Sequence, residues 1–226
     1  MDNNKNIFAI YKEKGPTSHD IINRVRRITG ERRVGHAGTL DPLASGVLVV
    51  AVGREWTKKL GEIVVKEKEY IADIKLGEES ATDDEEGEKF SLLVNKFISL
   101  QEIKKAADKF IGKIKQTPPV YSAIKINGKP AHRLVRAGKD VKLEPREVEI
   151  KSIEILKYEW PFLKLRVVTG PGVYIRALAR DIGRELGVGG YLYELERTRV
   201  GEYDKNNALT IEELTINYKS QTSNFK

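Results

Sequence analysis

One segment constrains this chain more than any other: residues 35–46, GHAGTLDPLASG, which run directly into the apolar stretch 47–52. Asp before Pro is typical of a helix or turn start, because Asp accepts N–H groups of the first turn and Pro presets the backbone. The pattern therefore predicts one helical turn over residues 42–45, closed by Gly46, and a buried strand over residues 47–52.

Asp41 is the one carboxylate in this segment. One interpretation is a helix cap, and the local pattern by itself favours it. The other is a reactive carboxylate that is held on a rigid turn at the edge of a strand, where functional groups often lie. The local sequence leaves both interpretations open.

The charge of the chain is unevenly distributed. The net charge is +7, and residues 78–88 contribute −7 with seven acids and no base, so the remainder carries +14. A basic body with one acidic loop favours a polyanionic partner, above all nucleic acid. Ordinary enrichment of surface lysine is the alternative.

Several classes of protein are disfavoured. The chain has no cysteine and three scattered histidines, so neither disulfides nor a metal-ligand spacing is expected. The first residues carry no apolar signal region, and no apolar run approaches the roughly 20 residues of a membrane span. We expect a cytoplasmic protein without a cofactor or a membrane association.

Hydrophobic periodicity and capping patterns place the remaining elements. Helices are expected after Thr17-Ser18, over residues 57–63, after Ser99, over residues 173–186 and after Thr210; strands are expected over residues 7–11, 71–76, 147–157, 162–169 and 191–200.

Residues 113–146 form a basic segment that is rich in turn signals. They predict an excursion from the core, with a hairpin at Asn127-Gly128, that grips a phosphate backbone; a solvated connection is the alternative. Further on, Arg176, Arg180 and Arg184 recur on one helix face, which usually faces solvent. Arg176 lies in the first turn, where the helix dipole disfavours a cation, so a partner anion is expected there.

Three segments taken together resemble the TruB-type pseudouridine synthases, which isomerise the T-loop uridine (position 55) of transfer RNA. They are residues 35–46, Lys68-Glu69-Tyr70 and residues 172–183, with weaker matches at residues 14–18, 118–125 and 195–198. The resemblance implies an α+β fold: a mixed, mainly antiparallel central sheet flanked by helices. It implies a catalytic domain over residues 1–214, an RNA-gripping insertion at about 113–146, and a polar, disordered tail over residues 215–226.

The resemblance also implies roles for the matched positions. Asp41 matches the catalytic aspartate, Arg176 its ion-pair partner, and Tyr70 the tyrosine that stacks on the flipped base and is a possible proton acceptor. The other matched positions line the base pocket or lie beside the RNA: Tyr174, Leu195 and His36.

The implied partner is the T-arm of tRNA, bound by a monomer with no obligate protein partner. Glu13 departs from the family by replacing a usual proline, and only about a dozen residues follow Leu214, so the usual C-terminal RNA-binding domain is not expected. A non-catalytic RNA-binding or RNA-folding module is the alternative function. A third possibility is that a guide RNA and partner proteins choose the substrate. The short chain disfavours it.

Overall fold

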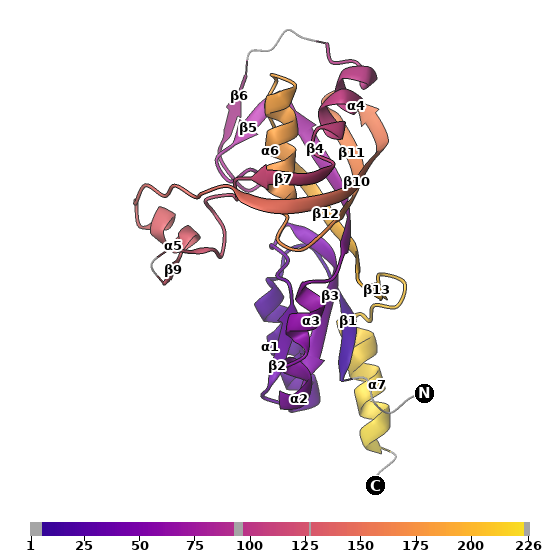
Figure 1. Ribbon diagram of the computed structural model, residues 1–226. Coiled ribbons are helices and arrows are strands. Elements are labelled where there is room, and N and C mark those ends of the chain that lie inside the picture. Colours follow the sequence, from indigo (N-terminus) through magenta and orange to yellow (C-terminus); the bar gives the residue numbers. More distant parts are fainter. Residues whose placement is uncertain (1–5, 93–96, 127, 224–226) are drawn as a thin grey trace. The chain divides into compact units, whose positions relative to one another are not determined.

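The computed structural model describes residues 6–92, 97–126 and 128–223. The chain forms two compact units, where the sequence predicts one domain over residues 1–214: a first unit of Met1–Tyr70 with Leu195–Lys226, and a second unit of Ile71–Glu194. The strands β4 (Lys68–Leu76) and β12 (Gly190–Val200) carry the chain from one unit to the other (Figure 1).

The first unit contains further strands and helices: β1 (Ile7–Lys12), α1 (Ser18–Thr29), β2 (Val34–Ala37), β3 (Ala44–Val52), α2 (Arg54–Thr57), α3 (Leu60–Val64), β13 (Tyr203–Asp204) and α7 (Ile211–Ser223). Strand β3 pairs antiparallel with β1 and β2 and parallel with β12. The expected mixed sheet of an α+β fold is confirmed.

Residues 47–52 of strand β3 are all apolar, as expected for a strand with both faces buried. Its residues 47–51 are fully buried. Val47 and Val49 pack in one core cluster with Leu60 of α3, whereas Leu48 and Val50 pack in another cluster with residues of α1. Strand β3 thus supports the loop that precedes it from two sides.

Two helices start at the predicted capping patterns, after Thr17 and after Ser99. Thr17 accepts from the Asp20 amide, and the Asp20 carboxylate accepts from the Thr17 amide at 2.9 Å; Ser99 and Glu102 start α4 (Leu100–Asp108) in the same way. The closing helix α7 continues to Ser223, where the sequence predicts a disordered tail from residue 215. A hydrogen bond of 2.8 Å from the Tyr218 hydroxyl to the Thr29 carbonyl holds this extension on α1; residues 224–226 lie outside the described part.

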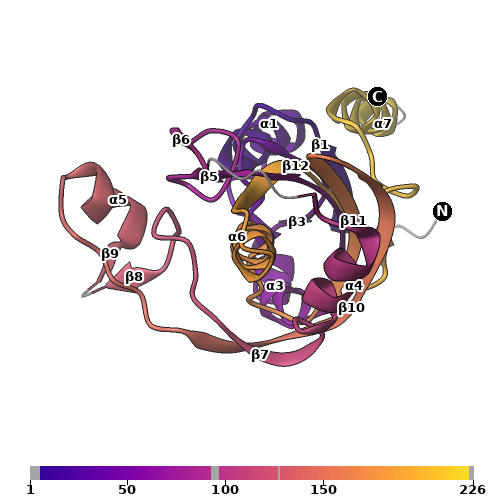
Figure 2. The same cartoon turned by 90° about the horizontal axis from the view of Figure 1, so that it is seen from above.

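The second unit contains the remaining elements: β5 (Glu78–Ser80), β6 (Lys89–Ser91), α4, β7 (Gly112–Gln116), β8 (Lys125–Ile126), β9 (Lys129–Pro130), α5 (Ala131–Arg136), β10 (Arg146–Glu159), β11 (Phe162–Thr169) and α6 (Ile175–Glu185). Its sheet has the order β4-β11-β10-β7, with β10 antiparallel to both neighbours. Figure 2 shows α4 and α6 within the curve that β7, β10 and β11 make.

The basic insertion is shorter than predicted, because its first residues form β7 and pair with β10. The excursion therefore covers residues 117–145 and contains the predicted hairpin, in which β8 pairs with β9; Asn127 of its turn lies outside the described residues. Figure 2 shows α5, β8 and β9 standing away from the sheet of the second unit. Within the described parts of the chain, no helix is long and apolar enough to cross a membrane.

Candidate active site

The loop that carries Asp41 is a tight turn fixed by buried hydrogen bonds. The Ala44 amide donates to the Asp41 carbonyl at 3.0 Å, and β3 begins at Ala44, so a turn stands where a helical turn over 42–45 is predicted. The Ser18 hydroxyl donates to the Leu40 carbonyl at 2.9 Å and accepts from the Leu40 amide at 2.9 Å. Lys12, fully buried, donates to the Ala44 carbonyl at 2.6 Å. Asp41 itself is half-buried, so this rigid turn keeps its side chain partly accessible to solvent.

Gly46 brings strands β3 and β12 into close contact beside this turn. It pairs in register with Arg197 and has φ 107°, a region that favours glycine. A Cβ atom at this position would lie 2.2 Å from the Arg197 carbonyl oxygen. The glycine is therefore required by both the backbone conformation and the approach of the neighbouring strand.

Arg197 lies at the centre of a buried polar cluster in the first unit. It is 2% exposed, and it donates from Nε to the Val47 carbonyl at 2.8 Å and from Nη2 to the Gly38 carbonyl at 3.0 Å. It also interacts electrostatically with the side chain of Tyr70, which is 7% exposed. Lys68 completes the cluster, with its Nζ donating to the Val64 and Lys66 carbonyls at 2.8 Å each. The cluster joins the Asp41 loop to the start of β4.

Burial sets the direction of the pKa shifts in this cluster. Burial raises the pKa of Tyr70; the charge and hydrogen bond of Arg197 oppose that shift, and Asp41 adds to it. Burial, with a smaller effect from Arg197, lowers the pKa of Lys68 to about 8. Burial also lowers the pKa of His36, which Arg197 and His19 lower further.

The predicted residues divide between the two units. His36 on β2, Asp41, Tyr70 and Leu195 belong to the first unit, where Leu195 pairs in register with Ala44 directly after the turn. Tyr174 and Arg176 belong to the second unit.

In the second unit, a buried side chain fixes the start of α6. Gln116, 2% exposed, accepts from the Tyr174 amide at 2.8 Å and donates to the Tyr174 carbonyl at 3.1 Å. Tyr174 is the N-cap residue, and Arg176 follows in the first turn. This two-point contact sets the position of the arginine relative to β7.

Arg176 has the partner anion that its position predicts. Its Nη1 lies 3.1 Å from Asp84 Oδ2 and 3.1 Å from the Thr82 carbonyl, and its Nη2 donates to the Tyr121 carbonyl at 3.0 Å. The two charged side chains are 7% and 4% exposed. The predicted pairing with Asp41 stays a prediction.

The other arginines of the stripe also pair with the acidic segment. Arg180 binds Asp83 at 2.8 Å, and Arg184 binds Glu79 at 3.2 Å. Arg180 is 9% exposed, so the expectation of a solvent-facing stripe is wrong for that residue. Residues 78–91 form the β5–β6 hairpin, and the ion pairs from its acidic residues to Arg176, Arg180 and Arg184 hold it on α6.

Sequence reasoning assigned no role to Arg197, Asp84 or Gln116. Arg197 lies inside one of the weaker family matches, and a charged residue in a strand is a signal of its own. Asp84 was visible as part of a charge run. Gln116 gives no signal in a single sequence, since its role depends on pairing at a distance.

The described residues contain no group of three or more His, Cys, Asp or Glu side chains that could hold a metal ion. The cluster and the neighbouring loop offer a half-buried carboxylate, a buried phenol and a buried guanidinium.

Comparisons with known families and sequences point in one direction. Residues 26–175 match the family described as "TruB family pseudouridylate synthase (N terminal domain)", and residues 176–224 match "tRNA pseudouridylate synthase B C-terminal domain". A tRNA pseudouridine synthase B of Thermobifida fusca is 43% identical over 220 residues, covering 94% of this chain and 75% of the relative. A tRNA pseudouridine synthase B of Parabacteroides distasonis is 43% identical over 204 residues, covering 88% of this chain and 86% of the relative.

Solved structures show the same fold. A chain of a Cbf5-Nop10-Gar1 complex superposes with a TM-score of 0.75 at 28% identity, over 97% of this chain. An archaeal box H/ACA sRNP Nop10-Cbf5 complex gives a TM-score of 0.72 at 27% identity. This chain spans 56% of the length of each of those solved chains.

Proposed function

The chain belongs to the TruB family of pseudouridylate synthases, and we propose that it converts uridine to pseudouridine in the T-loop of tRNA, at position 55. The observation that carries the proposal is the half-buried Asp41 on a rigid turn, whose flanking backbone at Gly38 and Val47 is bound by Arg197. The relatives named tRNA pseudouridine synthase B support tRNA as the substrate.

The reaction breaks the N1–C1′ bond of uridine, turns the uracil and joins C5 to C1′, with loss of the C5 proton and gain of one at N1. It is an isomerisation, without oxidation or reduction. An ionised carboxylate serves it either as the nucleophile at C1′ or as the base that takes a proton from C2′. We assign this role to Asp41 and leave both routes open.

Tyr70 is proposed to stack on the flipped base. Removing a base from its stack costs a few kcal/mol, and stacking on an aromatic ring offsets that cost. The Tyr70 ring is held in place by burial and by the interaction with Arg197. Leu195 and Tyr174 are proposed to line the base pocket.

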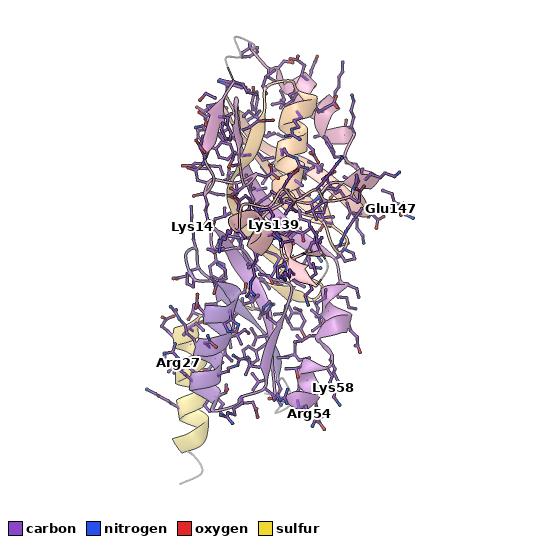
Figure 3. All side chains as sticks on the ribbon, turned by 90° about the vertical axis from the view of Figure 1, so that its left-hand side faces the viewer. Lys14, Arg27, Arg54, Lys58, Lys139 and Glu147 are labelled. Atoms are coloured by element: carbon purple, nitrogen blue, oxygen red, sulfur yellow. The ribbon has the colours of Figure 1, made fainter. Side chains whose placement is uncertain are left out.

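Exposed cations support RNA binding by the first unit. A groove of about 620 Å³ is lined by Arg26, Arg32, Arg33 and His36, among others. Figure 3 labels further basic side chains of this unit, Arg27 on α1 together with Arg54 and Lys58 at α2, which are exposed. A polyanion is attracted by such a surface, and phosphate contacts position it without reading sequence.

The basic insertion of the second unit supports the same partner. Lys139, labelled in Figure 3, is one of its exposed cations. We propose that residues 117–145 contact the tRNA backbone, that the protein acts as a monomer in the cytoplasm, and that it needs no protein partner. A non-catalytic module is disfavoured because both Asp41 and Arg176 are present.

The test is to incubate the purified protein with an unmodified tRNA transcript and map pseudouridine by position. A matched transcript with cytidine at the target site is the control. Product at the T-loop uridine of the first transcript, and none in the second, is expected. Absence of product from both transcripts would overturn the proposal.

A further inference from the structure

Arg197 is a buried cation for which the described part of the chain provides no carboxylate partner. Its guanidinium contacts the Gly38 carbonyl, the Val47 carbonyl and the Tyr70 side chain. Within the described residues no acid pairs with it, and burial lowers its pKa with only Tyr70 opposing that shift. Burying a charge without an opposite charge is costly, so the fold retains Arg197 at the expense of stability.

The three partners of Arg197 belong to the Asp41 loop and to Tyr70, which the proposed reaction requires in one fixed arrangement. Gly38 lies three residues before Asp41, and Val47 follows the same turn in β3. Tyr70 is the proposed stacking residue. A planar guanidinium can donate in three directions at once in a fixed geometry, which the flexible ammonium of Lys does not reproduce.

The interaction with Tyr70 brings a cation to the phenol group. A guanidinium only donates, so any hydrogen bond between the two groups runs from Arg197 to the phenol oxygen. The ring that carries this oxygen is itself buried, at 7% exposure.

We infer, on the basis of the proposed function, that Arg197 is a positioning residue of the reaction: it locks the Tyr70 hydroxyl and the Asp41 loop into one arrangement. Because Arg197 is only 2% exposed, we assign it no contact with the target base or the reacting atoms. Its effect passes through Tyr70 and through the backbone of the loop.

The test is a double-mutant cycle of Arg197→Lys and Tyr70→Phe. Single-turnover pseudouridine formation, the tRNA dissociation constant and the thermal midpoint are measured for the wild type, both single variants and the double variant. If Arg197 acts through the phenol, Arg197→Lys slows the reaction about ten-fold or more in the wild type and less than about three-fold in Tyr70→Phe, because interacting residues are not additive. The dissociation constant stays within about two-fold.

Arg199→Lys is the matched control. Arg199 lies two residues further along β12, is half-buried and pairs with Glu67 at 2.6 Å. It has no contact with Tyr70 among its hydrogen bonds, so wild-type rates are expected. If Arg197→Lys does not fold, Arg197→Gln, which leaves no buried charge, replaces it in the same cycle.

Two results would overturn the inference. One is a wild-type rate for the folded Arg197 variant. The other is an equal loss of rate with and without the Tyr70 hydroxyl, which indicates a purely structural role. Both require an active wild-type protein, so they are distinguishable from a failure of the proposed function, in which the wild type itself makes no pseudouridine.

Discussion

Arg176 and Asp84 form a buried ion pair in the second unit, with 3.1 Å between Nη1 and Oδ2. The pair anchors the acidic hairpin to the first turn of α6. Removing one partner of a buried pair leaves the other charge uncompensated, and this costs more than the pair itself contributes.

Asp84→Asn is therefore expected to lower the free energy of unfolding by about 3 kcal/mol. Urea unfolding measures it. Glu79→Gln is the control, because the Glu79–Arg184 pair is exposed, with side chains 34% and 59% accessible; its loss is expected to stay below about 1 kcal/mol. Equal effects of the two substitutions would contradict the assignment of the buried pair as the anchor.

Arg176→Lys tests the proposed role of this arginine in the reaction. Arg176 donates from both terminal nitrogens, to Asp84 and to the Tyr121 carbonyl, and a lysine ammonium does not reproduce this fork. We expect the single-turnover rate to fall at least about ten-fold, which is about 1.4 kcal/mol of transition-state stabilisation, with tRNA binding preserved. A variant that turns over as fast as the wild type would argue against a role for the two-nitrogen contact of Arg176.

Gly46→Ala tests the close approach of β3 and β12. The added Cβ atom would lie 2.2 Å from a backbone oxygen, and φ is 107°. We expect a loss of about 4 kcal/mol or more in the free energy of unfolding. Gly61→Ala in α3 is the matched control, since its Cβ meets nothing within 4 Å, and it is expected to stabilise by about 0.5–1 kcal/mol through helix propensity. A tolerated Gly46→Ala would contradict the described register.

The lowered pKa of Lys68 predicts that the free energy of unfolding depends on pH. Its pKa is lowered to about 8 in the folded protein and is about 10.4 in the unfolded chain. Between these values the unfolded chain binds the proton that the folded protein has released, so the free energy of unfolding rises with pH, by up to about 1.4 kcal/mol per pH unit. The difference in this free energy between wild type and Lys68→Met should increase from about pH 7.5 to about pH 9.5. A constant difference would contradict the lowered pKa.

Local signals in the sequence predicted the elements that local chemistry determines. Both capping boxes, the apolar strand β3 and the β8–β9 hairpin follow from residues close in sequence. The helical turn over 42–45 was wrong because strand pairing at Ala44 outcompetes the local cap pattern. The polar residues after 214 form part of α7 because Tyr218 contacts α1, which composition does not reveal.

The site was predictable only in part. The family motifs indicate Asp41, Tyr70 and Arg176, but the contacts that hold them come from distant parts of the chain. Arg197 reaches Gly38 across 159 positions of sequence, and Arg176 reaches Asp84 across 92. Such pairings depend on sheet order, which no local pattern encodes.

The central claim is that Asp41 carries the chemistry. The most direct measurement is single-turnover pseudouridine formation on an unmodified tRNA transcript by the wild type and by Asp41→Asn, with tRNA binding and thermal unfolding of both recorded. The predicted result is product at the T-loop uridine with the wild type and none with Asp41→Asn, although the variant is folded and binds tRNA. Product formation by Asp41→Asn at the wild-type rate would contradict the claim.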